Sequence, residues 1–463
     1  MVFYRTCHTT QISPQKNNAN SEMCQWGEEH AKIPLQCNPA SACVNADDTL
    51  LAVALEHDIH IYTTAALHLH QVLKGHASRV DTLNFHPQEP RMLVSCNMNN
   101  YGGSAQAEPA IIFWDLDEQR QRSLESESTL QAVGNRIVEG VISGLQEAGS
   151  TWLLNEHERV SLAKDAAKVV ELLNIKSQIR ENTQIHGRVN ASFGSRTFNA
   201  SGTRLAFLPP ARPYPQKDEN ICIWDTAKRE VCLTLQGHSD AIMWVGFSPD
   251  DKLIGSSSWD KAFRIWSNVD GSLLHTFTTS GQNWTGAFSP DSQYFAGTSG
   301  DGHFWVWDLK DGSQVVIQEF GPPKGSWSGW SRTLDWRPDG KQLAVGGQDL
   351  GRLILFDIES QSVVQERMLS TEESPEEHRS MMGRFLEVTK VQYLAGGRQI
   401  ASYTSNDHGV EIYDLVDNKK WRFAPGKAEF KGWGDDLVVI AQHGLIASVD
   451  PDAIRFWKLP IKE

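Results

Sequence analysis

Short stretches in which apolar and polar residues alternate recur along the chain. A spacing of two is expected of a strand that buries one face. Most of these stretches follow a nearly continuous apolar run, such as residues 50–54 or 343–346. Eight of them end in an aromatic residue, at Tyr62, Trp114, Trp224, Trp266, Trp307, Phe356, Tyr413 and Trp457. The pattern therefore predicts an all-β fold built from many short strands.

The stretch between residues 237 and 308 repeats itself. Phe247 returns as Phe288 and Trp266 returns as Trp307, in each case 41 positions later. A period of about 40–45 residues is typical of a four-stranded propeller blade. The eight alternating stretches therefore predict eight blades in a ring. A seven-bladed ring with an irregular end is the alternative, because the first and last stretches match the repeat least well.

The motifs of this repeat resemble those of the WD-repeat family. They are Gly-His at 237–238, Ser-Pro-Asp at 248–250, a turn that contains an Asp, and a third strand that ends in Trp. The resemblance implies a β-propeller in which one His, Ser, Asp and Trp form a hydrogen-bonded set inside a blade. The matching residues are His238, Ser256, Asp260 and Trp266. We interpret this set as structural and not catalytic, because its Ser is expected to be buried and no oxyanion donors can be identified.

The patterns divide the chain into four regions. Residues 1–29 are polar and mixed, and we expect a flexible N-terminal segment there. Residues 30–117 are expected to hold the first two blades and, at 30–37, a strand that by the resemblance completes the last blade and closes the ring. Residues 118–183 are expected to form a helical insertion between the second and third blades. Residues 184–463 are expected to hold the remaining blades.

Within residues 118–183 the spacing of apolar residues changes from two to three or four, which predicts two amphipathic helices. Such a helix pair either lies against the side or rim of the propeller or forms an arm that docks a partner. The apolar positions are Leu130, Val133, Ile137, Val141 and Leu145 in one run, and Leu162, Ala166, Val169, Val170 and Leu173 in the other.

Composition narrows the possible partners and compartments. The net charge is −14, with 43 Lys and Arg against 57 Asp and Glu, and this balance disfavours binding to nucleic acid. We expect no membrane insertion and no secretion, because no apolar run approaches 18 residues and the N-terminus lacks a signal-like apolar core. The seven Cys contain no CxxC pair. They indicate reduced thiols in a cytoplasmic or nuclear protein.

Tryptophans that the repeat does not explain gather near one predicted face of the ring. Residues four or six positions before the first-strand core residue of each blade are expected to border the top mouth of the channel. Aromatic and Arg side chains dominate binding energy at protein interfaces. The alternative is that the aromatics pack between blades. The predicted partner-binding residues are Trp259, Trp284, Trp330, Arg332, Trp327, Met243, Arg79 and Asp81.

These observations favour a non-catalytic scaffold that binds a protein or peptide on the top face of the propeller. No phosphate loop, HExxH or GxSxG motif is present, and we expect no metal and no cofactor. One alternative is an enzyme, such as a hydrolase, with a pocket at the channel mouth, where Asp81 is the only acid that can be placed. Another is a scaffold whose main contact is the helical insertion. The sequence does not predict the oligomeric state.

Overall fold

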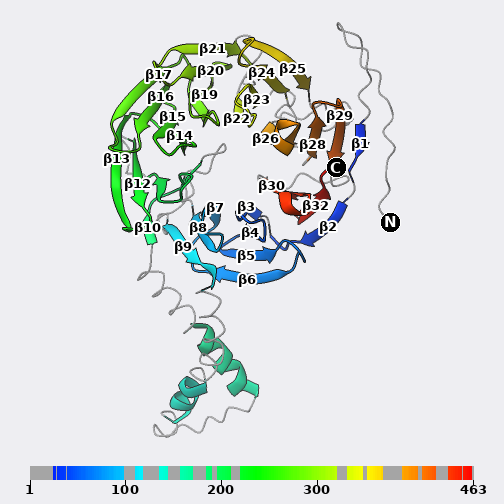
Figure 1. Cartoon of the computed structure of the whole chain (residues 1–463). Helices are drawn as coiled ribbons and strands as arrows, with labels where there is room; N and C mark the ends of the chain where they lie inside the picture. Colours follow the sequence, from blue (N-terminus) through cyan, green and yellow to red (C-terminus); the bar gives the residue numbers. More distant parts are fainter. Residues whose placement is uncertain are drawn as a thin grey trace.

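The strands form eight small sheets that stand side by side around a central axis (Figure 1). This arrangement belongs to the residues that the computed structural model describes, namely 24–27, 29–37, 39–97, 110–117, 135–143, 157–169, 184–189, 196–209, 219–320, 331–347, 352–368, 388–404, 409–423, 436–450 and 452–460. The all-β, eight-bladed propeller is therefore confirmed, and the seven-bladed alternative is wrong.

Within each blade, consecutive strands are antiparallel and follow one another from the axis outward, and the last two blades each gain an outer strand from the N-terminal segment. The first blade contains β3 (Pro39–Val44), β4 (Leu50–Leu55), β5 (Asp58–Thr63) and β6 (Leu69–Lys74). The second contains β7 (Val80–Phe85), β8 (Met92–Asn97), β9 (Ala110–Asp115) and β10 (Gln184–His186). The third contains β11 (Arg204–Phe207), β12 (Glu219–Asp225) and β13 (Glu230–His238), with Phe198 bridged to Leu205 on its inner side. The fourth contains β14 (Ile242–Phe247), β15 (Leu253–Ser258), β16 (Ala262–Ser267) and β17 (Leu273–Thr278).

The remaining four blades follow the same order. The fifth contains β18 (Asn283–Phe288), β19 (Tyr294–Ser299), β20 (His303–Asp308) and β21 (Gln314–Glu319). The sixth contains β22 (Ser331–Trp336), β23 (Gln342–Gly347), β24 (Arg352–Asp357) and β25 (Ser362–Met368). The seventh contains β26 (Val388–Leu394), β27 (Gln399–Thr404), β28 (Gly409–Asp414), β29 (Lys419–Phe423) and, outermost, β1 (Cys24–Trp26). The eighth contains β30 (Asp436–Ile440), β31 (Leu445–Val449), β32 (Ala453–Lys458) and β2 (Glu29–Pro34).

The core lies between neighbouring blades, which explains the continuous apolar runs. All six residues of β4 are buried. Leu50 and Ala52 pack with Trp114 of the second blade, whereas Leu51 and Val53 pack with residues of the eighth. Because side chains alternate along a strand, the second strand of a blade faces two neighbours and is apolar on both sides. A single blade cannot bury these surfaces, so the ring forms as a unit.

The ring has two faces, which we call upper and lower. The upper face is the one on which the inner strand of each blade starts. Because successive strands are antiparallel, the turns between second and third strands lie on this face too. The turns between first and second strands and between third and fourth strands lie on the lower face. A 3-10 turn, η5 (Ala441–His443), is one of these lower turns, and η4 (Ala395–Gly397) is another.

Two N-terminal strands complete the outer edges of the last two blades. β2 pairs antiparallel with β32, which confirms the predicted closing strand. β1 pairs parallel with β29. Of the segment predicted to be flexible, 1–29, residues 24–26 and 29 belong to strands, and residues 1–23 lie outside the described residues. A three-residue strand is too short to show an alternating pattern, and it escaped prediction for this reason.

The helical insertion is confirmed, and it follows β9 directly. Helical residues 135–143 and 157–169 lie between β9 and β10 and project outward from the ring (Figure 1). Because β10 pairs with β9, the insertion joins the two outer strands of the second blade, just before the third. Of the predicted apolar positions, Leu130, Val133, Leu145, Val170 and Leu173 lie outside the described residues. No helix in the described part of the chain is long and apolar enough to span a membrane.

Candidate functional site

The predicted structural set forms one hydrogen-bonded chain in the fourth blade. His238 Nδ1 donates to Asp260 Oδ2 at 2.7 Å, and His238 Nε2 lies 2.7 Å from Ser256 Oγ. Trp266 Nε1 also donates to Ser256 Oγ, at 3.2 Å. Gly237 precedes the His with a φ of +140°, a conformation that side-chain-bearing residues rarely adopt, which accounts for the Gly-His pair.

This Ser-His-Asp arrangement holds the blade together and does not offer a nucleophile. Ser256 is 0 % exposed, and its hydroxyl is engaged by both His238 and Trp266. Burial opposes ionisation of Asp260, but the hydrogen bond and charge of His238 and backbone N–H groups hold its pKa below the usual value. A buried carboxylate with all these partners stabilises structure.

Other blades keep parts of this set. In the second blade, His76 Nε2 lies 2.6 Å from Ser95 Oγ, which also accepts from Trp114. In the fifth blade, Trp305 and not Trp307 donates to Ser299. In the eighth blade the set is different again, since Trp457 donates to Ser448 while Arg455 Nη1 donates to Asp450 Oδ2 at 2.9 Å. A Ser of the second strand that accepts a hydrogen bond from a Trp of the third strand is therefore common to these blades, although Ser299 lies two positions further along its strand than the others.

Three of the predicted partner-binding residues meet on the upper face. Trp259 lies in the turn between β15 and β16, Trp284 is the second residue of β18, and Arg332 is the second residue of β22. The Trp259 and Trp284 rings meet edge to face with centroids 5.5 Å apart. The Arg332 guanidinium carbon lies 4.7 Å from the Trp284 ring centroid. The fourth, fifth and sixth blades thus join in one cluster, which we call the upper Trp-Arg cluster.

Burial divides this cluster into a supporting residue and two surface residues. Trp284 is only 5 % exposed, whereas Trp259 and Arg332 are partly exposed. Packing between blades, the alternative raised for these aromatics, therefore describes Trp284. Its ring gives Arg332 a cation–π contact and Trp259 an edge contact, and such contacts fix side-chain orientation. Of the three residues, Trp259 and Arg332 are the ones that reach the surface.

The other predicted contact residues lie in other segments of the ring or outside the described residues. Met243 is partly buried on β14 of the fourth blade. Arg79 and Asp81 lie at the start of β7 in the second blade, where Arg79 Nε lies 3.6 Å from Asp81 Oδ1. Trp327 and Trp330 lie outside the described residues.

Titratable groups elsewhere near the inner strands have structural partners. Burial raises the pKa of Asp335 on β22 to about 6. Its Oδ2 accepts a hydrogen bond from the backbone N–H of Tyr393 at 2.7 Å, which ties the inner strands of the sixth and seventh blades together. Among the described residues, no three His, Cys, Asp or Glu side chains are grouped so as to hold a metal ion.

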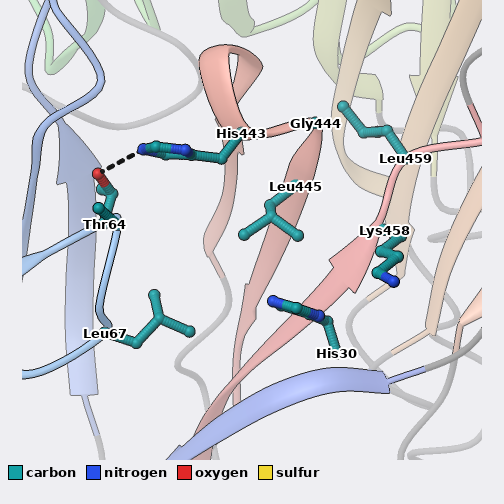
Figure 2. Close-up of a pocket in the computed structure, with 9 residues that line it drawn as sticks. His30, Thr64, Leu67, His443, Gly444, Leu445, Lys458 and Leu459 are labelled. Atoms are coloured by element: carbon teal, nitrogen blue, oxygen red, sulfur yellow. Dashed lines mark hydrogen bonds between the residues drawn. The ribbon is translucent and has the colours of Figure 1, made fainter.

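The sequence patterns did not indicate a hollow on the lower face between the eighth and first blades (Figure 2). His30, Thr64, His443 and Lys458 are among the residues that line it. They lie far apart in the chain and outside the repeat motifs. They come together only where the eighth blade meets the first. The hollow could therefore be predicted only by knowing which strands close the ring.

Comparisons with known proteins agree with the geometry. The family model described as "WD domain, G-beta repeat" matches residues 229–267 and 271–308. The transcriptional corepressor LEUNIG_HOMOLOG of Arabidopsis thaliana is 23% identical over 42% of this chain and 25% of its own length. Eukaryotic translation initiation factor 3 subunit I of Pyricularia oryzae is 34% identical over 13% of this chain and 18% of its own. The U5 small nuclear ribonucleoprotein 40 kDa protein of Pongo abelii is 43% identical over 10% of this chain and 12% of its own.

The chain thus spans a quarter or less of the length of each of these relatives. Each matched segment runs from the outer strand of one blade through the first three strands of the next, namely β13 to β16 and β17 to β20, where the repeat motifs are most complete. The likeness to WD-repeat proteins is not limited to these two segments. The fourth blade contains the hydrogen-bonded set that the resemblance implies, and the chain as a whole forms an eight-bladed ring. Two segments of the chain are thus WD repeats by sequence, and the ring as a whole has the β-propeller fold expected of proteins built from such repeats.

Proposed function

We propose that this protein is a non-catalytic scaffold that binds a protein or peptide partner through the upper Trp-Arg cluster. The observation that carries the proposal is the contact of Arg332 and Trp259 with the same buried Trp284 ring. Partly exposed Trp and Arg side chains held in fixed orientations resemble the anchors that supply most of the binding energy at interfaces. Because three blades contribute, the cluster exists only in the folded ring.

The partner's chemistry follows from the same residues. A Trp ring offers a large apolar surface, and the Arg332 guanidinium offers donors to a carboxylate or backbone carbonyl. We infer a peptide segment that carries an apolar side chain next to an acceptor group. The net charge of −14 makes nucleic acid an unfavourable ligand. Two similar proteins are named as a subunit of an initiation factor and a protein of a small nuclear ribonucleoprotein, and we propose a cytoplasmic or nuclear location for this chain as well.

The test compares partner capture by matched variants. Trp259→Ala combined with Arg332→Gln is expected to abolish capture of the proteins that co-purify with the tagged wild-type chain from its host. Trp284 stays unchanged, because truncating a buried Trp costs about 3–5 kcal/mol of stability and would confuse the result. Arg229→Gln, an exposed Arg in the lower turn between β12 and β13, serves as the control.

Capture is measured by quantitative mass spectrometry, and folding by the thermal unfolding midpoint. Retention of all partners by the double variant would refute the upper Trp-Arg cluster as the binding surface. Loss of the same partners from Arg229→Gln would refute it equally.

A second candidate contact surface is the helical insertion. Ile137, Val141 and Leu162 are 41 %, 55 % and 46 % exposed, although they are among the apolar positions of the predicted helices. Exposed aliphatic residues on a projecting helix pair favour an interaction role for it. Deletion of the insertion separates the two hypotheses.

A further inference from the structure

A half-open hollow of about 340 Å³ lies on the lower face, where the two ends of the chain close the ring. Five segments build it. β2 supplies His30, the turn after β5 supplies Thr64 and Leu67, η5 and β31 supply His443 and Leu445, and the end of β32 supplies Lys458. The hollow faces away from the upper Trp-Arg cluster, so a ligand here would be independent of the proposed function.

The described side chains that line the hollow include hydrogen-bond donors and no carboxylate. Figure 2 shows the His30 and His443 rings and the Lys458 side chain placed around the space beside Leu445. None of the described residues that line it is an Asp or Glu, although the chain as a whole has a net charge of −14. A Lys ammonium and His rings without acidic neighbours favour an anionic ligand.

The acidic groups on adjoining segments are already engaged. Asp48 Oδ2 accepts a hydrogen bond from the backbone N–H of Gln442 at 2.8 Å. Glu29, the neighbour of His30, lies 3.6 Å from Arg455 Nε. The side chains of His30 and Lys458, in contrast, make no hydrogen bond or ion pair with any residue in the described part of the chain. Their charges and donors are therefore available to a ligand.

One wall of the hollow is fixed and another is apolar. Thr64 is 2 % exposed; its hydroxyl donates to the Asp48 carbonyl at 2.5 Å and lies 3.2 Å from His443 Nε2. These bonds hold the His443 ring at the edge of the hollow. Leu67 and Leu445 form the apolar part of the lining, and both pack against the core cluster between the eighth and first blades.

We propose that this hollow binds an aliphatic carboxylate, with the carboxylate between Lys458 and the two His rings and the aliphatic group against Leu67 and Leu445. A volume of about 340 Å³ accommodates one leucine-like side chain and its carboxylate, but not a large cofactor. A charge-assisted hydrogen bond to Lys458 supplies the selectivity for an anion. The carboxylate can belong to the C-terminus of a peptide or to an acidic side chain beside a leucine.

The test uses three small probes and the NMR signals of histidine rings labelled at Cε1. N-acetyl-leucine carries a terminal carboxylate, N-acetyl-aspartyl-leucinamide carries a side-chain carboxylate, and N-acetyl-leucinamide is neutral. At least one charged probe is expected to shift the His30 and His443 signals, with a dissociation constant on the order of 1 mM for ligands of this size. Whichever charged probe binds better identifies the source of the carboxylate.

Matched variants connect the shifts to the hollow. Lys458→Gln is expected to weaken binding of the charged probe by about tenfold. Lys310→Gln, an exposed Lys in the lower turn of the fifth blade, is expected to leave it unchanged. Equal shifts with the neutral probe, no shift with either charged probe, or unchanged binding by Lys458→Gln would each overturn the proposal.

Discussion

At the scale of single residues, the same hydrogen-bonded His has a carboxylate partner in one blade and none in another. His238 donates to Asp260, so its ring is balanced by a nearby negative charge. His76 contacts Ser95 but has no carboxylate partner among the described residues. Burial therefore lowers the pKa of His76 to about 4, from an ordinary value of 6.5. The second blade consequently holds a His that the fold keeps neutral.

This difference predicts a pH-dependent weakness in the second blade. Between pH 6.5 and pH 4 the unfolded chain protonates His76 while the folded chain does not, so acid favours unfolding. The free energy of unfolding of the wild type, minus that of His76→Gln, is expected to fall by about 1.4 kcal/mol between pH 7.5 and pH 5.5. Chemical unfolding of both proteins at the two pH values measures this difference. A difference that stays constant with pH would show that His76 titrates normally in the folded state.

At the scale of elements, a strand can be predicted from the sequence only if it is long enough to show the alternation of apolar and polar residues. The six-residue strands of the fourth and fifth blades alternate clearly, and the pattern predicts them, together with the His, Ser, Asp and Trp set of the fourth blade. β1 and β10 have three residues each, too few to show a period. The insertion was therefore placed after a complete second blade, whereas β10 follows it. The upper Trp-Arg cluster was predicted in part, because periodicity places Trp284 at the mouth but cannot tell that neighbouring blades cover it.

The insertion is expected to be dispensable for the ring. Replacing residues 118–183 with a short Gly-Ser turn lets β9 continue into β10, which pair directly through Ile111 and Ile185. Val141 and Val169 are 55 % and 56 % exposed, so little apolar contact is lost with the helices. We expect the thermal midpoint to fall by no more than a few degrees, with the β-sheet circular dichroism retained. A collapse of the midpoint would show that the helices support the ring.

The same deletion separates the two proposed contact surfaces. If partners bind the upper Trp-Arg cluster, capture survives the deletion and is lost in the Trp259→Ala and Arg332→Gln variant. If they bind the insertion, the pattern is reversed. Each outcome supports one surface and contradicts the other, provided that both proteins keep the thermal midpoint expected of them.

At the scale of the whole molecule, the ring is closed by two segments from opposite ends of the chain. β2 is the fourth strand of a blade whose other three strands are C-terminal. Ala31, Ile33 and Leu35 of this N-terminal segment pack against the core between the eighth and first blades. Without β2, the outer edge of β32 loses its ladder partner and this core is uncovered. Closure of the ring therefore stabilises every blade, because neighbouring blades share their cores.

Two N-terminal truncations are expected to separate closure from simple edge covering. Removal of residues 1–27 deletes β1 alone and exposes only the outer edge of β29, so a small loss of stability is expected. Removal of residues 1–35 also deletes β2 and the three aliphatic residues, which costs about 3–5 kcal/mol of apolar burial in addition to the strand pairing. We expect the longer truncation to lower the thermal midpoint sharply and to aggregate through its open edge.

A synthetic peptide of residues 29–37, added in trans, is expected to restore the midpoint by pairing with β32. A peptide of the same composition in scrambled order is not expected to restore it. If both truncations behave alike, or the scrambled peptide restores stability equally well, the antiparallel pairing of β2 with β32 is not what closes the ring.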